Sequence, residues 1–342
     1  MKNSIQFSPD ISQANSFDFF RLLFAFSVFV AHFDVLTYNT FWFPISAGMG
    51  VSGFFIISGF FITRSYYRSK NLGDYTAKRI RRIVPAYMLI VVVCAVLLSL
   101  LSSLSLQEYF SNKDFFRYLA ANISFLNFIQ PTLPDVFTNN PLPYVNGALW
   151  TIKVEICLYA CVPILALFIK KKPAFLFVFL YIFSFFFVLY MNFLAEKTGN
   201  NLYEILSRQF LGQIRFFISG VALLFYFDWL KQNKKWLLPI SIIIIISRYF
   251  VSFQAIDLFY PIAFAVTIIL FAYIFSGLKI LTRFGDYSYG LYLFHFPVIQ
   301  IITHFGWLKN SPALLFLLCF GVTFLLSCLS WHFLEKRVLK RA

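Results

Sequence analysis

The chain alternates between long runs of apolar residues and short polar segments. Most of the runs reach the roughly 17–25 residues that a helix needs to cross the apolar core of a bilayer. The pattern therefore predicts an all-α, polytopic membrane protein with about ten transmembrane helices. These helices are expected at 17–38, 46–63, 83–106, 148–169, 173–195, 204–227, 237–254, 256–276, 286–306 and 312–334.

Composition supports this fold class. Of the 342 residues, 60% are hydrophobic and only 13% are charged, whereas about a quarter of the residues are charged in a typical soluble domain. The first sixteen residues are polar and no small-residue cleavage pattern follows the first apolar run, so we expect the first span to stay in the mature protein. We expect a single membrane domain over residues 1–342, with 1–16 as a cytoplasmic N-terminal segment and 107–147 as the largest extracytoplasmic loop.

The net charge of +15 is explained mainly by topology. If the N-terminus lies in the cytoplasm, nineteen Lys and Arg residues fall in the inside loops and four in the outside loops. The positive-inside rule then predicts that both termini are cytoplasmic, and nucleic acid is not needed as a partner. The cysteines lack metal-ligand spacing, so no metal site is expected.

The first apolar run, "FRLLFAFSVFVAHFD", contains Arg21 and His32. Their separation of eleven residues corresponds to three helical turns plus about 20°, so both side chains point the same way, about 16 Å apart along the axis. In the predicted orientation, Arg21 lies near the cytoplasmic end of this helix and His32 in its outer half.

Further ionisable residues fall within or at the edges of the predicted spans, where a central arginine costs at least ~2.5 kcal/mol. Cations outnumber carboxylates among them, which predicts an anionic ligand. Glu155 lies about as deep as His32 and is expected to orient a catalytic imidazole. The alternative is a structural pair of Glu155 with Arg208 or Arg215.

Two other segments bear on binding and packing. In "YTAKRIRRIVPAYML", Arg79 and Arg82 share one helix face just before Pro85; such a basic face binds phosphates or anchors the topology against lipid headgroups. In "GVSGFFIISGFFIT", Gly50 and Gly59 are expected to let helices approach closely.

Six motifs, in order over roughly residues 17–340, resemble those of the acyltransferase 3 family of integral membrane acyltransferases. Arg21 and His32 match its arginine–ten residues–histidine signature. The other five motifs are "GVSGFFIISGF", "RIRRIVPAY", "ALWTIKVEICLY", "FGDYSYGLYLFHFPV" and "WHFLEKRV". They place matching residues at Arg79, Arg82, Pro85, Tyr87, Leu149, Trp150, Glu155, Tyr159, Ser288, Tyr289, Tyr292, Leu293, His295, Pro297 and Glu335.

The chain departs from this family's pattern in two ways. Many members have two adjacent acids where this chain has Glu155 followed by Ile156. Some members carry a fused extracytoplasmic hydrolase-like domain, whereas this chain ends at Ala342, so it is expected to be a stand-alone member.

The resemblance implies transfer of an acyl group, most often acetyl, from cytoplasmic acetyl-CoA to a hydroxyl of a surface carbohydrate or lipid-linked glycan. Lipopolysaccharide O-antigen, capsule and exopolysaccharide are typical acceptors, and a bacterial inner membrane is the expected location. Under this hypothesis His32 is the general base, Glu155 assists it and Arg21 contacts the donor arm. Arg79, Arg82 and Arg64 are expected to bind the phosphates of CoA. The expected acceptor-binding residues are Trp150, Tyr289, His295 and Arg215, with His295 alternatively a hydrogen-bonded interior histidine.

A membrane transporter or flippase of a glycan or anionic metabolite is the alternative function. Intramembrane charges suit such a carrier. We find no inverted repeat and no matching pair of broken helices in the sequence, which favours the enzyme.

Overall fold

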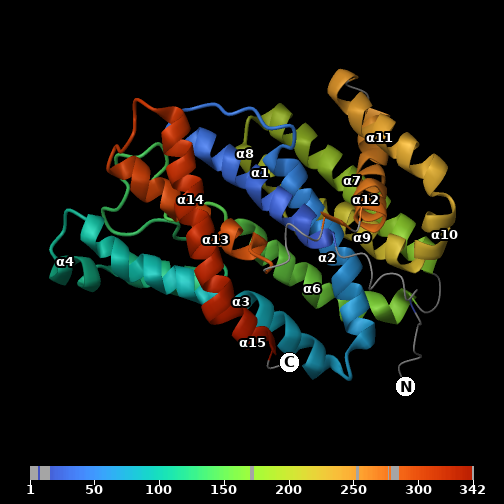
Figure 1. Cartoon of the computed structure of the whole chain (residues 1–342), viewed down its shortest axis with the longest axis horizontal. Coiled ribbons are helices and arrows are strands. Elements are labelled where there is room, and N and C mark those ends of the chain that lie inside the picture. The colour runs from blue at the N-terminus through green and yellow to red at the C-terminus, as the bar shows by residue number, and fades with distance from the viewer. Residues whose placement is uncertain are drawn as a thin grey trace. The chain divides into compact units, whose positions relative to one another are not determined.

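The computed structural model describes residues 7, 16–169, 173–251, 254–275, 277–278 and 285–340, and all regular structure in these residues is helical (Figure 1). A helix lies at each of the ten predicted positions. They are α1 (Phe17–Thr37), α2 (Ala47–Arg68), α3 (Leu72–Leu97), α6 (Trp150–Ile169), α7 (Pro173–Thr198), α9 (Phe210–Phe225), α11 (Lys234–Phe250), α12 (Gln254–Ile274), α13 (Ser288–His304) and α14 (Pro312–Ser330). The shorter elements are η2 (Leu98–Leu101), α4 (Leu106–Ser111), α5 (Lys113–Ile123), α8 (Asn201–Ser207), α10 (Phe227–Gln232), the π-helical turn η4 (Trp331–Glu335) and α15 (Lys336–Lys340).

Seven of the described helices are long and apolar enough to cross a membrane, which supports the predicted class of membrane protein. The other three, α9, α11 and α13, have only 16, 17 and 17 residues. At 1.5 Å per residue they are about 24–26 Å long, less than the ~30 Å apolar core of a bilayer. The count of ten spans and the cytoplasmic location of both termini therefore stay predictions.

The chain divides into two compact units, each built from separate segments of the sequence. Unit 1 comprises Met1–Arg21, Val51–Tyr75 and Val154–Arg283, and unit 2 comprises Leu22–Gly50, Thr76–Lys153 and Phe284–Ala342. Unit 1 thus contains most of α2 and α6 together with α7 to α12. Unit 2 contains most of α1 and α3, the short helices α4 and α5, and α13 to α15.

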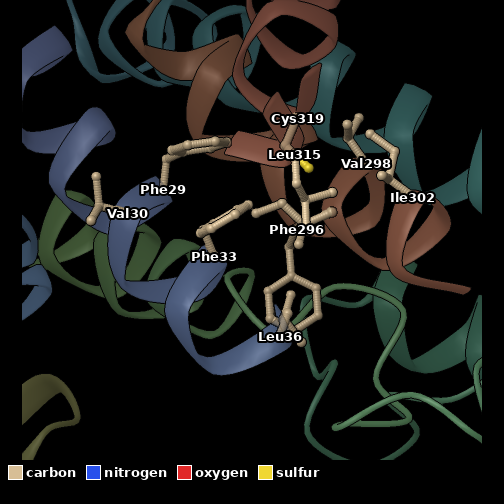
Figure 2. Packing of buried hydrophobic residues seen from close by; sticks show 10 residues of the cluster. Phe29, Val30, Phe33, Leu36, Phe296, Val298, Ile302, Leu315 and Cys319 are labelled. Carbon is tan, nitrogen blue, oxygen red and sulfur yellow. The ribbon is translucent and has the colours of Figure 1, made fainter. Parts of the chain in front are cut away.

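The apolar core of unit 2 joins α1 to α13 and α14. Phe29 and Phe33 on α1 are fully buried and lie near Phe296 on α13 and Leu315 on α14 (Figure 2). The rings of Phe316 and Phe320 on α14 pack edge-on against Phe26 and Phe29 on α1, and the Phe26 ring stacks on that of Phe29. This packing holds α1 against α14, and Phe296 of α13 belongs to the same core, which matters because α1 and α13 each carry one of the histidines discussed below.

The segment predicted as the largest loop, 107–147, is ordered by hydrogen bonds to α13 within unit 2. The fully buried side chain of Gln300 donates to the carbonyl oxygens of Leu142 (2.6 Å) and Tyr144 (2.7 Å). The Asn140 amide nitrogen donates to the Gln300 side-chain oxygen (2.8 Å). Because buried amides of this kind are costly to leave unpaired, the end of the loop is held on α13.

The start of the same loop has a pH-dependent cap. The Ser105 side chain accepts from the Glu108 backbone N–H, and Glu108 accepts from Ser105 in return, which forms a capping box at α4. These hydrogen bonds lower the pKa of Glu108 below its ordinary value of 4.5. The cap is therefore complete above that value and is lost as the pH falls through the lower pKa of the folded state.

In unit 1, α2 and α9 cross at two glycines. A Cβ added to Gly59 would lie 2.0 Å from the Phe217 carbonyl oxygen, and one added to Gly220 would lie 2.0 Å from that of Ile56. In unit 2, a Cβ at Gly50 would lie 2.9 Å from the Phe24 carbonyl oxygen. The close-packing interpretation of Gly50 and Gly59 is confirmed, because in each case only hydrogen fits against a neighbouring backbone.

This crossing predicts a stability defect. Gly220→Ala or Gly59→Ala must push α2 and α9 apart, and overpacking of this kind costs about 1–3 kcal/mol. The matched control is Gly321→Ala on α14, where an added Cβ meets nothing within 4 Å and helix propensity favours alanine. Thermal unfolding in detergent is expected to show a lower Tm for the two crossing variants and an equal or higher Tm for the control. An unchanged Tm in all three would contradict the crossing.

Candidate functional site

Unit 2 pairs the two histidines that the sequence singled out. The Nδ1 atom of His32 on α1 lies 2.8 Å from the Nε2 atom of His295 on α13. The rings stack with their centroids 5.0 Å apart and their planes 26° apart. Phe296 packs edge-on against the His32 ring, and Phe29 does the same against His295. The pair is therefore held between aromatic side chains of the two helices that carry it.

The hydrogen bonds of this pair determine which nitrogen holds each proton. The Nδ1 atom of His295 lies 3.0 Å from the Leu291 carbonyl oxygen, which only accepts, so this nitrogen carries the hydrogen. In a neutral ring the Nε2 atom of His295 is then an acceptor, and it takes the hydrogen bond from Nδ1–H of His32. The Nε2 atom of His32 is left with its lone pair, as a general base requires.

The two histidine rings differ in how much of their surface is exposed. The side chain of His295 has no exposed surface, whereas His32 is only half-buried. His295 is thus a hydrogen-bonded interior histidine, and its expected contact with the acceptor stays a prediction. His32 is the member of the pair that has exposed surface.

Hydrogen bonds attach the segment just before α6 to α13 next to His295. The Tyr292 hydroxyl donates to the Ala148 carbonyl oxygen (3.1 Å), and Asn146 donates to that of Leu293 (2.9 Å). A Cβ at Gly147 would lie 2.7 Å from the Phe296 ring, so this position needs glycine. These contacts place Trp150, which is half-buried at the start of α6, in the same unit as the histidine pair.

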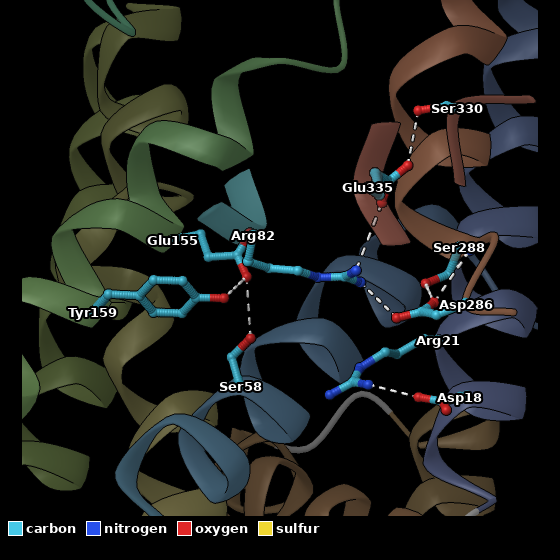
Figure 3. Close-up of polar contacts among 10 residues, drawn as sticks. All are labelled: Asp18, Arg21, Ser58, Arg82, Glu155, Tyr159, Asp286, Ser288, Ser330 and Glu335. Carbon is cyan, nitrogen blue, oxygen red and sulfur yellow. Dashed lines mark hydrogen bonds and ion pairs between the residues drawn. The ribbon is translucent and has the colours of Figure 1, made fainter. Parts of the chain in front are cut away.

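On the basic face of α3, Arg82 is paired with carboxylates. Its guanidinium lies 2.5 Å from an oxygen of Asp286 and 3.6 Å from one of Glu335 (Figure 3). The Glu335 side chain comes from the π-helical turn η4 and also accepts from Ser330 (2.9 Å). The role of Arg82 in binding CoA phosphates stays a prediction, and a phosphate there has to compete with two acids.

Tyr289 lies beside this ion pair and joins two helices. Its hydroxyl donates to the Ile83 carbonyl oxygen of α3 (2.8 Å), and its ring centroid lies 5.5 Å from the Arg82 guanidinium. The structure thus assigns Tyr289 a hydrogen bond between α13 and α3. Arg79 is half-buried on α3, one turn before Ile83.

In unit 1, Glu155 accepts hydrogen bonds from Ser58 (3.3 Å) and from Tyr159 (Figure 3). Arg208 is paired with Glu204 instead, so the alternative structural pair of Glu155 with Arg208 is wrong, and within the described residues no pair with Arg215 forms either. The expected help of Glu155 to His32 stays a prediction. The position at Nδ1 of His32, where an orienting acid would bind, is occupied by His295.

Arg21 and Arg64 also belong to unit 1, and they differ in pairing. Arg21 donates to Asp18 (2.7 Å) and lies 5.4 Å from the ring centroid of Phe61. Arg64, near the end of α2, is 8% exposed and makes no hydrogen bond or ion pair with the described residues; its Nε is buried without a partner. A buried guanidinium without a counter-ion is a better candidate for binding an anionic ligand than a guanidinium that is already paired with a carboxylate.

The structure therefore groups the candidate residues in two sets. Unit 2 brings together His32, His295, Trp150, Tyr289, Arg79 and Arg82, whereas unit 1 holds Arg21, Arg64, Glu155 and Arg215. Sequence reasoning missed Asp286 as the partner of Arg82. Its position two residues before Ser288 in the "FGDYSYGLYLFHFPV" motif was the available signal. In the described part of the chain, no three His, Cys, Asp or Glu residues lie together as metal ligands.

Comparison with known proteins gives a consistent picture. Residues 14–332 match the model of the family described as "Acyltransferase domain". The chain is 27% identical to a protein of Shigella phage Sf6 named "O-acetyl transferase", over 96% of this chain and 97% of that protein. It is 25% identical to "O-acetyltransferase OatA" of Staphylococcus aureus, over 86% of this chain and 53% of that protein. It is 26% identical to "Nodulation protein 10" of Rhizobium leguminosarum bv. viciae, over 95% of this chain and 93% of that protein. No solved structure matches the chain.

Proposed function

Because this chain belongs to the acyltransferase 3 family, we propose that it is an O-acetyltransferase that moves an acetyl group from acetyl-CoA to a hydroxyl of a cell-surface carbohydrate or lipid-linked glycan. The observation that carries the proposal is the hydrogen-bonded pair of His32 and His295, whose partners favour the tautomer of His32 with a free lone pair at Nε2. The relatives named as O-acetyltransferases support the acetyl group and the oxygen acceptor.

The histidine pair supplies acid–base chemistry for this transfer. Nε2 of His32 takes the proton of the acceptor hydroxyl while the oxygen attacks the thioester carbonyl carbon. The tetrahedral intermediate then expels the CoA thiolate and leaves the acetyl ester on the sugar. The His32 imidazolium returns its proton to the thiolate, so that CoA leaves as the thiol. Nε2 of His295 accepts the hydrogen bond from Nδ1–H of His32 throughout the reaction. This hydrogen bond becomes stronger once the His32 ring is charged.

The donor is expected to enter from the cytoplasmic side of a bacterial inner membrane, in the orientation that the loop charges predict. Three arginines are candidates for its phosphates: Arg64, Arg79 and Arg82. Arg64 has the strongest support, because its buried guanidinium has no counter-ion among the described residues, whereas Arg82 is paired with Asp286 and Glu335.

The donor assignment predicts a change in KM. Arg64→Gln removes one charge-assisted contact to a phosphate, worth about 1.5–3 kcal/mol, so the KM for acetyl-CoA is expected to rise roughly 10- to 100-fold while kcat changes little. Arg68→Gln, at the exposed end of the same helix, is the matched control and is expected to leave KM unchanged. Initial-rate kinetics of purified protein give both constants. An unaltered KM in Arg64→Gln would remove this residue from the donor site.

Mass spectrometry of surface glycan tests the function in cells. A deletion strain is expected to lose one O-acetyl group per modified sugar and to regain it when the wild-type gene is supplied. If the glycan of the deletion strain keeps its acetylation and is instead missing from the surface, the chain acts in export, and the proposed transfer is refuted.

A further inference from the structure

Arg215 on α9 is a second cation of unit 1 that forms no ion pair with the described residues. Its Nε is buried without a hydrogen-bond partner, and the side chain makes no hydrogen bond or ion pair with any described residue. Its backbone is engaged normally, since its N–H donates to Ser184 of α7 (3.2 Å) and its carbonyl oxygen accepts from Ser219 (2.6 Å). The guanidinium alone is therefore left unsatisfied.

Four side chains around Arg215 interact with it electrostatically. They are Tyr181 on α7, Asp257 and Tyr260 on α12, and Arg248 on α11. Tyr181 donates its hydroxyl to the Leu258 carbonyl oxygen. The only carboxylate of this group, Asp257, accepts from Arg248 at 2.7 Å. Asp257 is thus paired with Arg248, and the half-buried Arg215 forms no ion pair with the described residues.

The cluster extends from the interior of unit 1 to its surface. Arg215 is half-buried, whereas the side chains of Arg248 and Asp257 are 47% and 46% exposed. The Arg248 guanidinium also lies 4.3 Å from the ring centroid of Tyr260, which is buried. Arg248 is therefore the exposed cation of the cluster and Arg215 the half-buried one.

The three charged members of the cluster lie near the ends of their helices. Arg215 is in the second turn of α9, Arg248 in the last turn of α11 and Asp257 in the first turn of α12. In the orientation predicted from the loop charges, these ends are extracytoplasmic. Acetyl-CoA is expected on the opposite side, so a ligand that binds here belongs to the acceptor.

We propose that Arg215, with Arg248 beside it, binds an oxyanion of the acceptor, either the carboxylate of an acidic sugar or the phosphate of a lipid-linked glycan. Placing an arginine partly buried in a membrane helix bundle costs free energy. A charge-assisted, bidentate contact with an anionic ligand offsets this cost. This inference rests on the proposed function for the identity of the acceptor, but the anion site itself is testable without catalysis.

Two probes distinguish the sources of the oxyanion. Binding of glucuronate, and separately of undecaprenyl phosphate, is measured with purified protein in nanodiscs of zwitterionic phosphatidylcholine and without acetyl-CoA. Wild-type protein is expected to bind one of them, and Arg215→Gln is expected to weaken that binding at least 10-fold. Arg215→Lys keeps the charge but loses the planar guanidinium, and its affinity for the probe is expected to lie between those of wild type and Arg215→Gln. Binding of glucuronate would identify an acidic sugar, and binding of undecaprenyl phosphate would identify a lipid-linked phosphate.

Arg208→Gln is the matched control, because Arg208 is exposed and already paired with Glu204, and it is expected to bind the probe as wild type does. Equal binding by wild type and a monodisperse Arg215→Gln, or no binding of either probe by wild type, would overturn the anion site. If Arg215→Gln does not fold, Arg215→Lys decides, and wild-type affinity in that variant would overturn the proposal. A failure of the proposed function is recognised separately, as the absence of CoA release by wild-type protein given acetyl-CoA and acceptor.

Discussion

His32→Ala is expected to lower the rate of acetyl transfer by ~10²–10⁴-fold, the usual contribution of a general base. The variant removes the Nε2 lone pair that the hydrogen bond to His295 leaves free, and with it the group proposed to take the hydroxyl proton. The amount of folded protein in the membrane is expected to stay the same, because His32 is half-buried and its loss removes one hydrogen bond.

The matched control for this experiment is His304→Ala. His304 ends α13 and is exposed, so its removal tests for effects of losing any histidine from these helices. Release of CoA thiol and the acetyl ester of the acceptor are both measured on purified proteins. Wild-type rates in His32→Ala would refute the assignment of the base.

His295→Leu is expected to reduce kcat roughly 10- to 100-fold without changing the KM for acetyl-CoA, since part of the acid–base contribution depends on orientation of the base. Leucine fills the buried position of His295 but cannot accept from Nδ1–H of His32. The ring of His32 is then free to turn and to hold its hydrogen on either nitrogen. His295 is in this account a positioning residue, because it acts on the substrate only through His32.

Rescue by a conservative variant separates positioning from packing. His295→Gln retains a side-chain oxygen that accepts a hydrogen bond, so it is expected to recover a large part of kcat relative to His295→Leu. The pH dependence of kcat gives a second readout, because loss of the acceptor destabilises the His32 imidazolium and moves the acidic limb of the profile, where the base becomes protonated, to lower pH. Equal kcat values in the leucine and glutamine variants, with an unshifted profile, would show that His295 only fills space.

The positions of the helices were predictable from the apolar runs, but their lengths were not. α3 begins at Leu72 rather than at 83, because the polar segment with Arg79 and Arg82 continues the helix beyond the apolar run. α9 and α13 end earlier than predicted, because short separate helices or turns take up the residues at their ends. Hydropathy reports where a segment is apolar and does not report where its backbone stops being helical.

Residue chemistry was predictable within a helix, but partners from distant segments were not. The eleven-residue spacing of Arg21 and His32 follows from helical geometry. The contact of His32 with His295 joins residues 263 positions apart, and the pairing of Arg82 with Asp286 joins residues 204 positions apart. Single-sequence periodicity contains no information about which helix packs on which, so it could not predict His295 as the hydrogen-bond partner of His32.

Transfer by the purified chain alone is the most direct test of the central claim. Wild-type protein in nanodiscs is given acetyl-CoA with the acetyl group radiolabelled, together with the de-acetylated glycan of its own host. The account predicts that label appears as an ester on the glycan in equal amount to the CoA thiol released, and that neither product forms with His32→Ala. CoA release and glycan labelling that persist in His32→Ala, or glycan that stays unlabelled with wild-type protein, would contradict it.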